Sequence, residues 1–284
     1  MRIVVASGKG GTGKTTIATS LALVAAEQDS VHFMDCDVEA PNAGLFLNPV
    51  LDKRKEVGIL IPQVDEAACT FCGKCAEVCQ FHAIVVIGKK TLVFPELCHG
   101  CGSCTLVCPE YAISEHLDVM GVLEGGPAAH GIDFAQGVMN IGKPMAVPII
   151  RQLKKWTPAN SPKIEIRDAP PGASCPVVET IRGADFALLV TEPTPFGLHD
   201  LKQVVGISRE LGLPAGVVVN RDGIGDNSVE AYCQESSIPI LMRIPMERRI
   251  AAALASGAPL LEAAPEYRPD FQAMLAKIIA EVGA

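Results

Sequence analysis

Aromatic side chains are scarce in this chain of 284 residues, at 5% with a single Trp. Stacking of bases on aromatic rings supplies much of the energy of single-strand binding, so the sequence disfavours a single-stranded nucleic-acid binder. Positive charge is also short, because 24 Lys and Arg face 32 Asp and Glu, a net charge of −8. A surface that displaces counterions from DNA needs a basic excess. We therefore expect no nucleic-acid partner.

Long apolar runs are missing as well. No stretch approaches the roughly 18 apolar residues that a membrane-spanning helix requires. The first residues lack the basic segment, apolar core and small-residue cleavage site of a secretory signal. A closing helix is predicted at 267–282, and its polar face mixes charges instead of forming a basic stripe. We expect that helix to pack in the core, and the protein to be cytoplasmic with no membrane partner.

The composition is that of a globular protein, with 49% hydrophobic and 20% charged residues. A β-branched run at 2–6 ends in a Gly-rich loop, a helix-forming segment follows at 16–28, and a second apolar run lies at 31–34. This order is typical of a βαβ unit. Strand-like and helix-like segments alternate again from residue 143 onward. The sequence therefore predicts an α/β fold with a mainly parallel sheet flanked by helices.

The Gly-rich loop, Gly-Lys-Gly-Gly-Thr-Gly-Lys-Thr at 8–15, fits the Walker A phosphate-binding pattern. Its glycines let backbone N–H groups face phosphate oxygens, and the following helix directs its positive end to the same place. Lys14 is expected to reach the β- and γ-phosphates and Thr15 to ligate Mg²⁺. The predicted nucleotide-binding residues of this P-loop are Gly8, Lys9, Gly10, Gly11, Thr12, Gly13, Lys14, Thr15 and Thr16.

Eight of the eleven Cys fall between Cys69 and Cys108. They form two runs with the spacing Cys-x₂-Cys-x₂-Cys-x₃-Cys, at 69–79 and 98–108. Dense clustering inside a larger chain favours metal ligation over a disulfide framework. A single run is also compatible with zinc, but the same cadence repeated twice favours iron–sulfur clusters.

The segment Lys-Gly-Gly-Thr-Gly-Lys-Thr-Thr that begins at Lys9 resembles the deviant Walker A motif of the MinD/ParA/Mrp-type P-loop ATPases of the SIMIBI class. The resemblance implies an ATP-dependent sandwich dimer in which Lys9 reaches the partner's nucleotide. It also implies catalytic roles for Lys9, Lys14 and Asp37, with Asp37 orienting the attacking water. Asp35 then lies near the Mg²⁺. Further cofactor contacts implied by the resemblance are Asp168, Gly172, Asn220, Arg221 and Pro245, with Met246 beside Pro245.

The two Cys runs resemble those of bacterial two-cluster ferredoxins, in which the fourth Cys of each run ligates the other cluster. The resemblance implies a first 4Fe-4S cluster on Cys69, Cys72, Cys75 and Cys108, and a second on Cys98, Cys101, Cys104 and Cys79. Pro109 follows the second run as in ferredoxins, whereas Gln80 replaces the Pro after the first. We predict an inserted α+β ferredoxin-like domain at 62–118, within an ATPase domain formed by 1–61 and 119–284.

Both resemblances together imply an iron–sulfur ATPase in which a nucleotide-dependent dimer gates electron transfer through two clusters. The expected cofactors are ATP or ADP, Mg²⁺ and two 4Fe-4S clusters. The expected partners are a second copy or a related ATPase, and a redox or iron–sulfur client, with slow hydrolysis in the partner's absence. An Mrp-type cluster carrier and a MinD/ParA-like positioning ATPase are alternatives. Among the other Cys, we expect Cys175 to be a buried thiol, and Cys36 and Cys233 to be core residues.

Overall fold

A nine-stranded sheet organises the chain in the computed structural model, which describes residues 1–158 and 161–283. The strand order is β11-β10-β9-β1-β8-β2-β7-β6-β3, and every pairing from β11 to β7 is parallel. The parallel strands are β1 (Arg2–Ala6), β2 (Val31–Asp35), β7 (Asp133–Met139), β8 (Ile164–Asp168), β9 (Phe186–Thr191), β10 (Ala215–Asp222) and β11 (Ile240–Pro245). The predicted α/β fold with a mainly parallel sheet is therefore confirmed.

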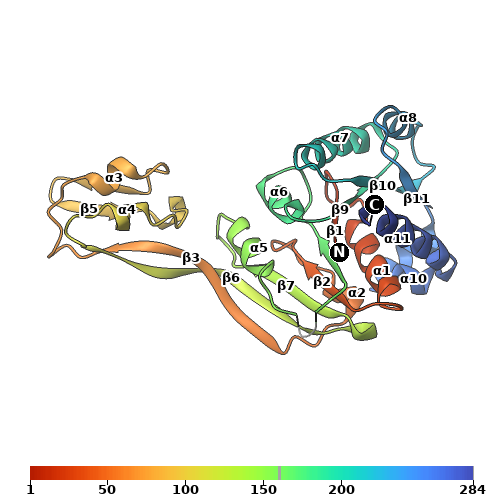
Figure 1. The fold of residues 1–284 in the computed structure, drawn as a ribbon, viewed down its shortest axis with the longest axis horizontal. Helices are drawn as coiled ribbons and strands as arrows, with labels where there is room; N and C mark the ends of the chain where they lie inside the picture. Colours follow the sequence, from red (N-terminus) through yellow and green to blue (C-terminus); the bar gives the residue numbers. More distant parts are fainter. Residues whose placement is uncertain (159–160, 284) are drawn as a thin grey trace.

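Helices cover both faces of the parallel strands (Figure 1). They are α1 (Lys14–Ala25), α2 (Gly44–Leu47), α5 (Val147–Leu153), α6 (Cys175–Ile181), α7 (Pro195–Glu210), α8 (Ser228–Glu235), α9 (Arg248–Ala255), α10 (Leu260–Ala263) and α11 (Arg268–Val282). Short 3₁₀ helices lie at Pro95–Leu97, Ala129–Gly131 and Pro265–Tyr267. Among the described residues, no helix combines the length and apolar character needed to cross a bilayer.

The side chains of β1 show how one short strand serves two cores. Ile3 and Val5 pack on one face with α1 and α11, whereas Val4 and Ala6 pack on the other with α6 and α7. This alternation follows from the two-residue period of a strand, and β1 is apolar from Ile3 to Ala6 because both faces are covered there. The predicted core packing of the last helix is confirmed, since Phe271 and Met274 of α11 are fully buried.

The other end of the sheet is a long antiparallel ribbon of β3 (Lys53–Val64) and β6 (Ile113–Pro127). Figure 1 shows that this ribbon extends away from the helices and carries residues 65–112 at its tip. That lobe contains α3 (Lys74–Val78), β4 (Ile84–Ile87), β5 (Lys90–Val93) and α4 (Ser103–Leu106). The predicted domain boundaries, 61/62 and 118/119, fall inside β3 and β6, so continuous strands join the lobe to the rest of the chain.

A β-bulge interrupts the ribbon between Val57 and Gly58. A Cβ atom on Gly58 would lie 1.9 Å from the backbone oxygen of Asp118, so this close approach of the two strands requires glycine. Gly206, in the middle of α7, has no neighbouring atom within 4 Å of the place where a Cβ would stand.

These two glycines give opposite expected outcomes on substitution by alanine. Gly58→Ala should lower the free energy of unfolding by about 1–3 kcal/mol, because the added methyl group overpacks the bulge. Gly206→Ala should raise it by about 0.5–1 kcal/mol, because alanine loses less backbone entropy in a helix. Denaturant unfolding of both variants checks the pair, and equal effects would contradict the packing described here.

Candidate nucleotide and cluster sites

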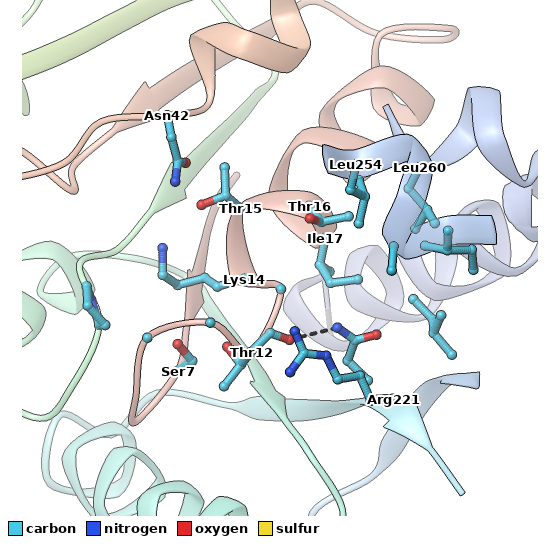
Figure 2. Close-up of a pocket in the computed structure, with 18 of the residues that line it drawn as sticks. Ser7, Thr12, Lys14, Thr15, Thr16, Ile17, Asn42, Arg221, Leu254 and Leu260 are labelled. Carbon is cyan, nitrogen blue, oxygen red and sulfur yellow. Dashed lines mark hydrogen bonds between the residues drawn. The ribbon is translucent and has the colours of Figure 1, made fainter. Parts of the chain in front are cut away.

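The P-loop connects β1 to α1 and bends at Gly11 and Gly13, whose φ angles are 78° and 89°. Only glycine adopts this left-handed backbone at little cost. Space is a second reason at Gly13, where a Cβ would lie 2.3 Å from Nδ2 of Asn220. That nitrogen donates to the backbone oxygen of Thr12 at 2.7 Å, which ties the P-loop to the end of β10 (Figure 2).

A cavity opens beside this loop, and most of the predicted nucleotide-binding residues line it. Figure 2 shows Thr15 and Thr16 at the start of α1, with Leu254 and Leu260 of the α9–α10 region at the same cavity. From the predicted set, the lining includes Lys9, Gly10, Gly11, Thr12, Gly13, Lys14, Thr15, Thr16, Asp37, Asn220 and Arg221, together with Met246. Gly8, Asp35, Asp168, Gly172 and Pro245 are outside that lining.

Asp168 ends β8 and is fully buried at the carboxyl edge of the sheet. Lys14 donates from Nζ to its Oδ1 at 2.7 Å, and Thr15 donates from Oγ1 to its Oδ2 at 2.6 Å. Burial alone would lower the pKa of Lys14, but the carboxylates of Asp168, Asp35 and Asp37 together outweigh burial and raise it. The structure thus brings together three predicted residues, and it keeps Lys14 charged at the place where phosphate oxygens would bind.

Asp35 ends β2, directly beside Asp168 on the neighbouring strand. Its carboxylate accepts backbone N–H groups of Asp37, Asn42 and Ala43 and so holds the loop that follows β2. Complete burial, followed by the proximity of Asp168, raises the pKa of Asp35 to about 7. Asp37 lines the cavity, and burial raises its pKa against the opposing effect of Lys14. The assignment of Asp35 to the Mg²⁺ environment stays a prediction.

Glu192 is a residue of this site that the sequence analysis did not identify. It lies at the end of β9, is 5% exposed, and accepts from both Lys9 and Arg221. Its Oε2 lies 2.8 Å from Lys9 Nζ, and its Oε1 lies 2.6 Å from Arg221 Nη1. The available signal was its position, a single acid directly after a buried strand at the carboxyl edge of a parallel sheet. Glu192 therefore holds Lys9 within its own subunit in this structure.

An apolar wall closes the cavity opposite the P-loop. It is formed by Ile250, Ala251 and Leu254 of α9 and by Leu260 of α10. Helix α9 was not predicted from the sequence, and Pro245 and Met246 were expected to contact the cofactor on this side of the cavity instead. Met246 lines the cavity and Pro245 does not. Apolar side chains with a few fixed polar groups such as Asn220 are typical of a pocket for an organic ring.

The eight clustered Cys line two separate cavities of the lobe. The first is lined by Cys69, Cys72, Cys75 and Cys108. The second is lined by Cys79, Cys98, Cys101 and Cys104. Each cavity thus combines three Cys of one run with the fourth Cys of the other, which is the grouping that the ferredoxin resemblance implies. Among the described residues, no three His, Cys, Asp or Glu side chains converge on a position suited to a single metal ion.

Backbone N–H groups face the sulfurs of both sets in the same pattern. Those of Phe71 and Gly100 donate to Cys69 and Cys98, at 3.4 Å in each case. Those of Ala83 and Ala112 donate to Cys79 and Cys108, at 3.3 Å in each case. Such donors stabilise negative charge on sulfur and tune an iron–sulfur site. The two Cys sets therefore share the same arrangement of backbone donors.

The remaining three Cys divide into two kinds. Cys36 and Cys233 are buried, as predicted, and burial raises the pKa of Cys36 to about 12, so this thiol stays protonated. The expectation that Cys175 is buried is wrong, because it is exposed at the first position of α6. Ser174 and Pro176 flank Cys175 at the start of this surface helix. The apolar residues around Cys175 in the sequence do not show which side of the helix faces solvent.

A family model described as the CobQ/CobB/MinD/ParA nucleotide binding domain matches residues 3–260. An uncharacterized protein of Methanocaldococcus jannaschii is 30% identical over 263 residues, which are 92% of each chain. A second uncharacterized protein of that organism is 33% identical over 228 residues, or 80% of each chain.

Solved structures of MinD share the fold. The cell division ATPase MinD of Pyrococcus furiosus matches with a TM-score of 0.57 and 22% identity, over 99% of this chain and 98% of that one. MinD of Pyrococcus horikoshii, solved in complex with Mg-ADP, matches with a TM-score of 0.58 and 20% identity, over 99% and 95% of the two chains.

Replacing Glu192 tests its role in holding Lys9 and Arg221. Glu192→Gln should lower the free energy of unfolding by about 1–3 kcal/mol, because two charge-assisted hydrogen bonds weaken in a buried position. Amide exchange in residues 8–11 should also accelerate, and mass spectrometry measures both effects. Glu210→Gln, at the exposed end of α7, is the matched control and should change neither quantity. A Glu192 variant indistinguishable from that control would exclude the holding role.

Proposed function

Because the chain belongs to the CobQ/CobB/MinD/ParA nucleotide-binding family, we propose that it is an ATPase whose nucleotide-dependent dimer gates electron transfer through two 4Fe-4S clusters. One observation carries this proposal: the two Cys sets that the ferredoxin spacing implies each line a cavity of their own, in the same chain as a P-loop. The P-loop alone supports a nucleotide-binding protein, and the Cys cavities supply the reason to add redox chemistry.

In the nucleotide half, each polar group has a distinct role. Lys14 and the P-loop N–H groups bind phosphate oxygens, and the Thr15 hydroxyl ligates Mg²⁺. Asp168, which accepts from Thr15, is placed to hold a water of the Mg²⁺ shell, with Asp35 beside it. Asp37 orients the attacking water. MinD of P. horikoshii, which shares the fold, was solved in complex with Mg-ADP, and this supports a magnesium nucleotide as the ligand of the cavity.

Lys9 connects nucleotide binding to the dimer. The side chain is one-third exposed and is held by Glu192 of the same subunit. In the proposed sandwich dimer, Lys9 leaves Glu192 and binds the phosphates of the partner's nucleotide. A triphosphate offers more acceptor oxygens and more negative charge than a single carboxylate, so it competes well for this lysine. The partner is a second copy of this chain or a related ATPase.

In the cluster half, the first set of thiolates would hold one 4Fe-4S group and the second set the other. When bound, these groups would supply one-electron transfer. The chain adds the N–H donors described above and leaves Cys72 and Cys101 exposed, one in each set. Next to the ligands, Leu106 and Tyr111 are 86% and 91% exposed. Exposed apolar side chains beside a redox group suit contact with a protein that donates or accepts electrons.

A second candidate function is an ATP-dependent iron–sulfur carrier. The exposure of Cys72 and Cys101 favours it, because an acceptor's thiols can reach an exposed ligand position. Incubating the cluster-loaded protein with an apo-acceptor separates the two functions. Transfer of iron together with activation of the acceptor favours the carrier, and electron transfer with the iron retained favours the redox role. A positioning ATPase also agrees with the MinD-like fold, but it gives no role to the eight clustered Cys.

Iron content and spin resonance test the cluster half. Anaerobically prepared protein should contain about eight irons per chain. Cys69→Ala and Cys108→Ala should remove the same cluster and leave identical residual spectra, because both residues line the first cavity. Cys79→Ala and Cys98→Ala should likewise agree with each other. The control Cys175→Ser should keep all the iron, since Cys175 lies outside both cavities. Residual spectra that group by run instead of by cavity would contradict the proposed ligand sets.

Two lysine variants test the nucleotide half. Lys14→Ala should abolish measurable ATP binding by calorimetry, because the phosphates lose their buried cation. Lys9→Ala should bind ATP within about threefold of the wild-type affinity, yet fail to dimerise with ATP in sedimentation experiments. A Lys9→Ala chain that dimerises normally with ATP would refute the role across the interface.

A further inference from the structure

Helix α5 lies between the nucleotide loops and the ribbon that carries the cysteine lobe (Figure 1). We propose that α5 is the positioning element that couples nucleotide state to the ribbon, through Gln152 and Lys143 on the ribbon side. This inference rests on the proposed function and specifies how the ATPase regulates the lobe.

On the nucleotide side, α5 lies against the loop that follows β2 and against helix α6, which comes after β8. Val38, next to Asp37, is buried, and its backbone oxygen accepts from Met139 at the end of β7. Val38 and Ile149 of α5 both pack onto Gly137, where a Cβ would lie 2.6 Å from Val38 Cγ1 and 3.0 Å from Ile149 Cγ2. The loop after Asp37 and helix α5 therefore meet over Gly137, within one buried apolar cluster, so a displacement of that loop can be passed on to α5.

The segment after Asp168 reaches α5 through a second contact. Helix α6 follows that segment, and its Glu179 accepts from Arg151 at 3.0 Å and from Lys154 at 3.1 Å. Lys154 also donates to the backbone oxygens of Glu179 and Arg182. Burial would raise the pKa of Glu179, but Arg151 and Lys154 outweigh it and lower the pKa. Helices α5 and α6 are thus joined by ion pairs and by backbone contacts of Lys154.

On the ribbon side, two hydrogen bonds bracket the bulge. Gln152 donates from Nε2 to the backbone oxygen of Gly58 at 2.8 Å. Lys143, just before α5, donates to Asp118 at 2.6 Å, and Asp118 is the residue whose backbone oxygen crowds Gly58. A bulge is a point where a ribbon bends and twists. Gln152 of α5 and Lys143 of the segment before it therefore hold one strand each, beside the position where bending is easiest.

Geometry amplifies any movement at this point. The ribbon continues from Gly58 to Val64 before the lobe begins, a span of about 20 Å at the usual rise per residue. A small rotation at the bulge consequently shifts the lobe by a larger distance than it shifts α5. Packed helices transmit such rotations because their interiors do not compress.

The single tryptophan reports on the contact. Trp156 follows α5 and packs in the same apolar cluster as Val57, Met120 and Leu153. A Cβ on Gly125 of β6 would lie 2.7 Å from its Cζ2 atom, so the indole ring rests on the ribbon backbone. A change in the α5–ribbon contact alters the surroundings of this ring and therefore its fluorescence.

The experiment compares cluster-loaded wild type with the double variant Lys143→Met and Gln152→Leu, which keeps the aliphatic bulk and removes both donors. Lys155→Met, at an exposed position next to α5, is the control. Deuterium exchange in residues 55–64 and 113–120, and Trp156 fluorescence, are measured with Mg-ADP and with a non-hydrolysable ATP analogue. ATP affinity is measured in parallel by calorimetry.

In wild type and control, ribbon exchange should differ at least about threefold between the two nucleotides. In the double variant this difference should fall to less than half, with ATP affinity unchanged within about twofold. A chain that binds no nucleotide overturns the proposed function and this inference together. A chain that binds and dimerises, but whose wild-type ribbon ignores the nucleotide, overturns the inference alone. A double variant that retains the full difference also overturns it.

Discussion

The buried carboxylate of Asp168 is the group on which the arrangement of the nucleotide site depends. The carboxylate joins Lys14 and Thr15 of the P-loop to the end of β8. The backbone oxygen of Asp168 accepts from the backbone N–H of Cys36, at the start of the loop after β2. One residue thereby connects three segments that are far apart in the sequence. Removing one partner from a buried ion pair costs about 3–5 kcal/mol, because the other charge stays buried without compensation. A partner that leaves the buried carboxylate of Asp168 must therefore be replaced by another cation or hydrogen-bond donor.

The sheet has two ends with different physical characters. Its parallel strands are apolar on both faces and place every nucleotide-binding loop at one edge, as the ends of neighbouring parallel strands must meet there. Its antiparallel end leaves the packed layers and becomes a free ribbon, which an antiparallel pair can do because one face tolerates solvent. The same sheet can therefore hold a rigid phosphate site and a projecting lobe. Helix α5 packs where the parallel strands give way to the antiparallel ones, on β7, β6 and β3.

Much of the site was predictable because its determinants are local. The P-loop glycines and the Cys spacings encode backbone turns within a few residues, and most of the residues in those patterns line the cavities described. The role of Glu192 could not be predicted, because its two partners lie at positions 9 and 221 and no short sequence pattern connects them. Strand β3 was not predicted for a different reason. Its first four residues, Lys53 to Glu56, are all exposed, so the strand lacks the apolar alternation that identifies a half-buried strand. The exposure of Cys175 depends on how α6 is rotated, which only tertiary packing determines.

In the proposed dimer, one lysine has to exchange one set of partners for another. Glu192 holds Lys9 and Arg221 together, so a Lys9 that left for a partner's phosphates would also free one carboxylate oxygen of Glu192 beside Arg221. The free energy of dimerisation must exceed that of the lost pair, and such couplings are typically about 1–3 kcal/mol. A diphosphate lacks the terminal charge that repays this loss. Because the Lys9 side chain is one-third exposed, the proposed exchange would need no unfolding. In the proposed dimer, the pair with Glu192 would make dimerisation depend on the terminal phosphate of the nucleotide.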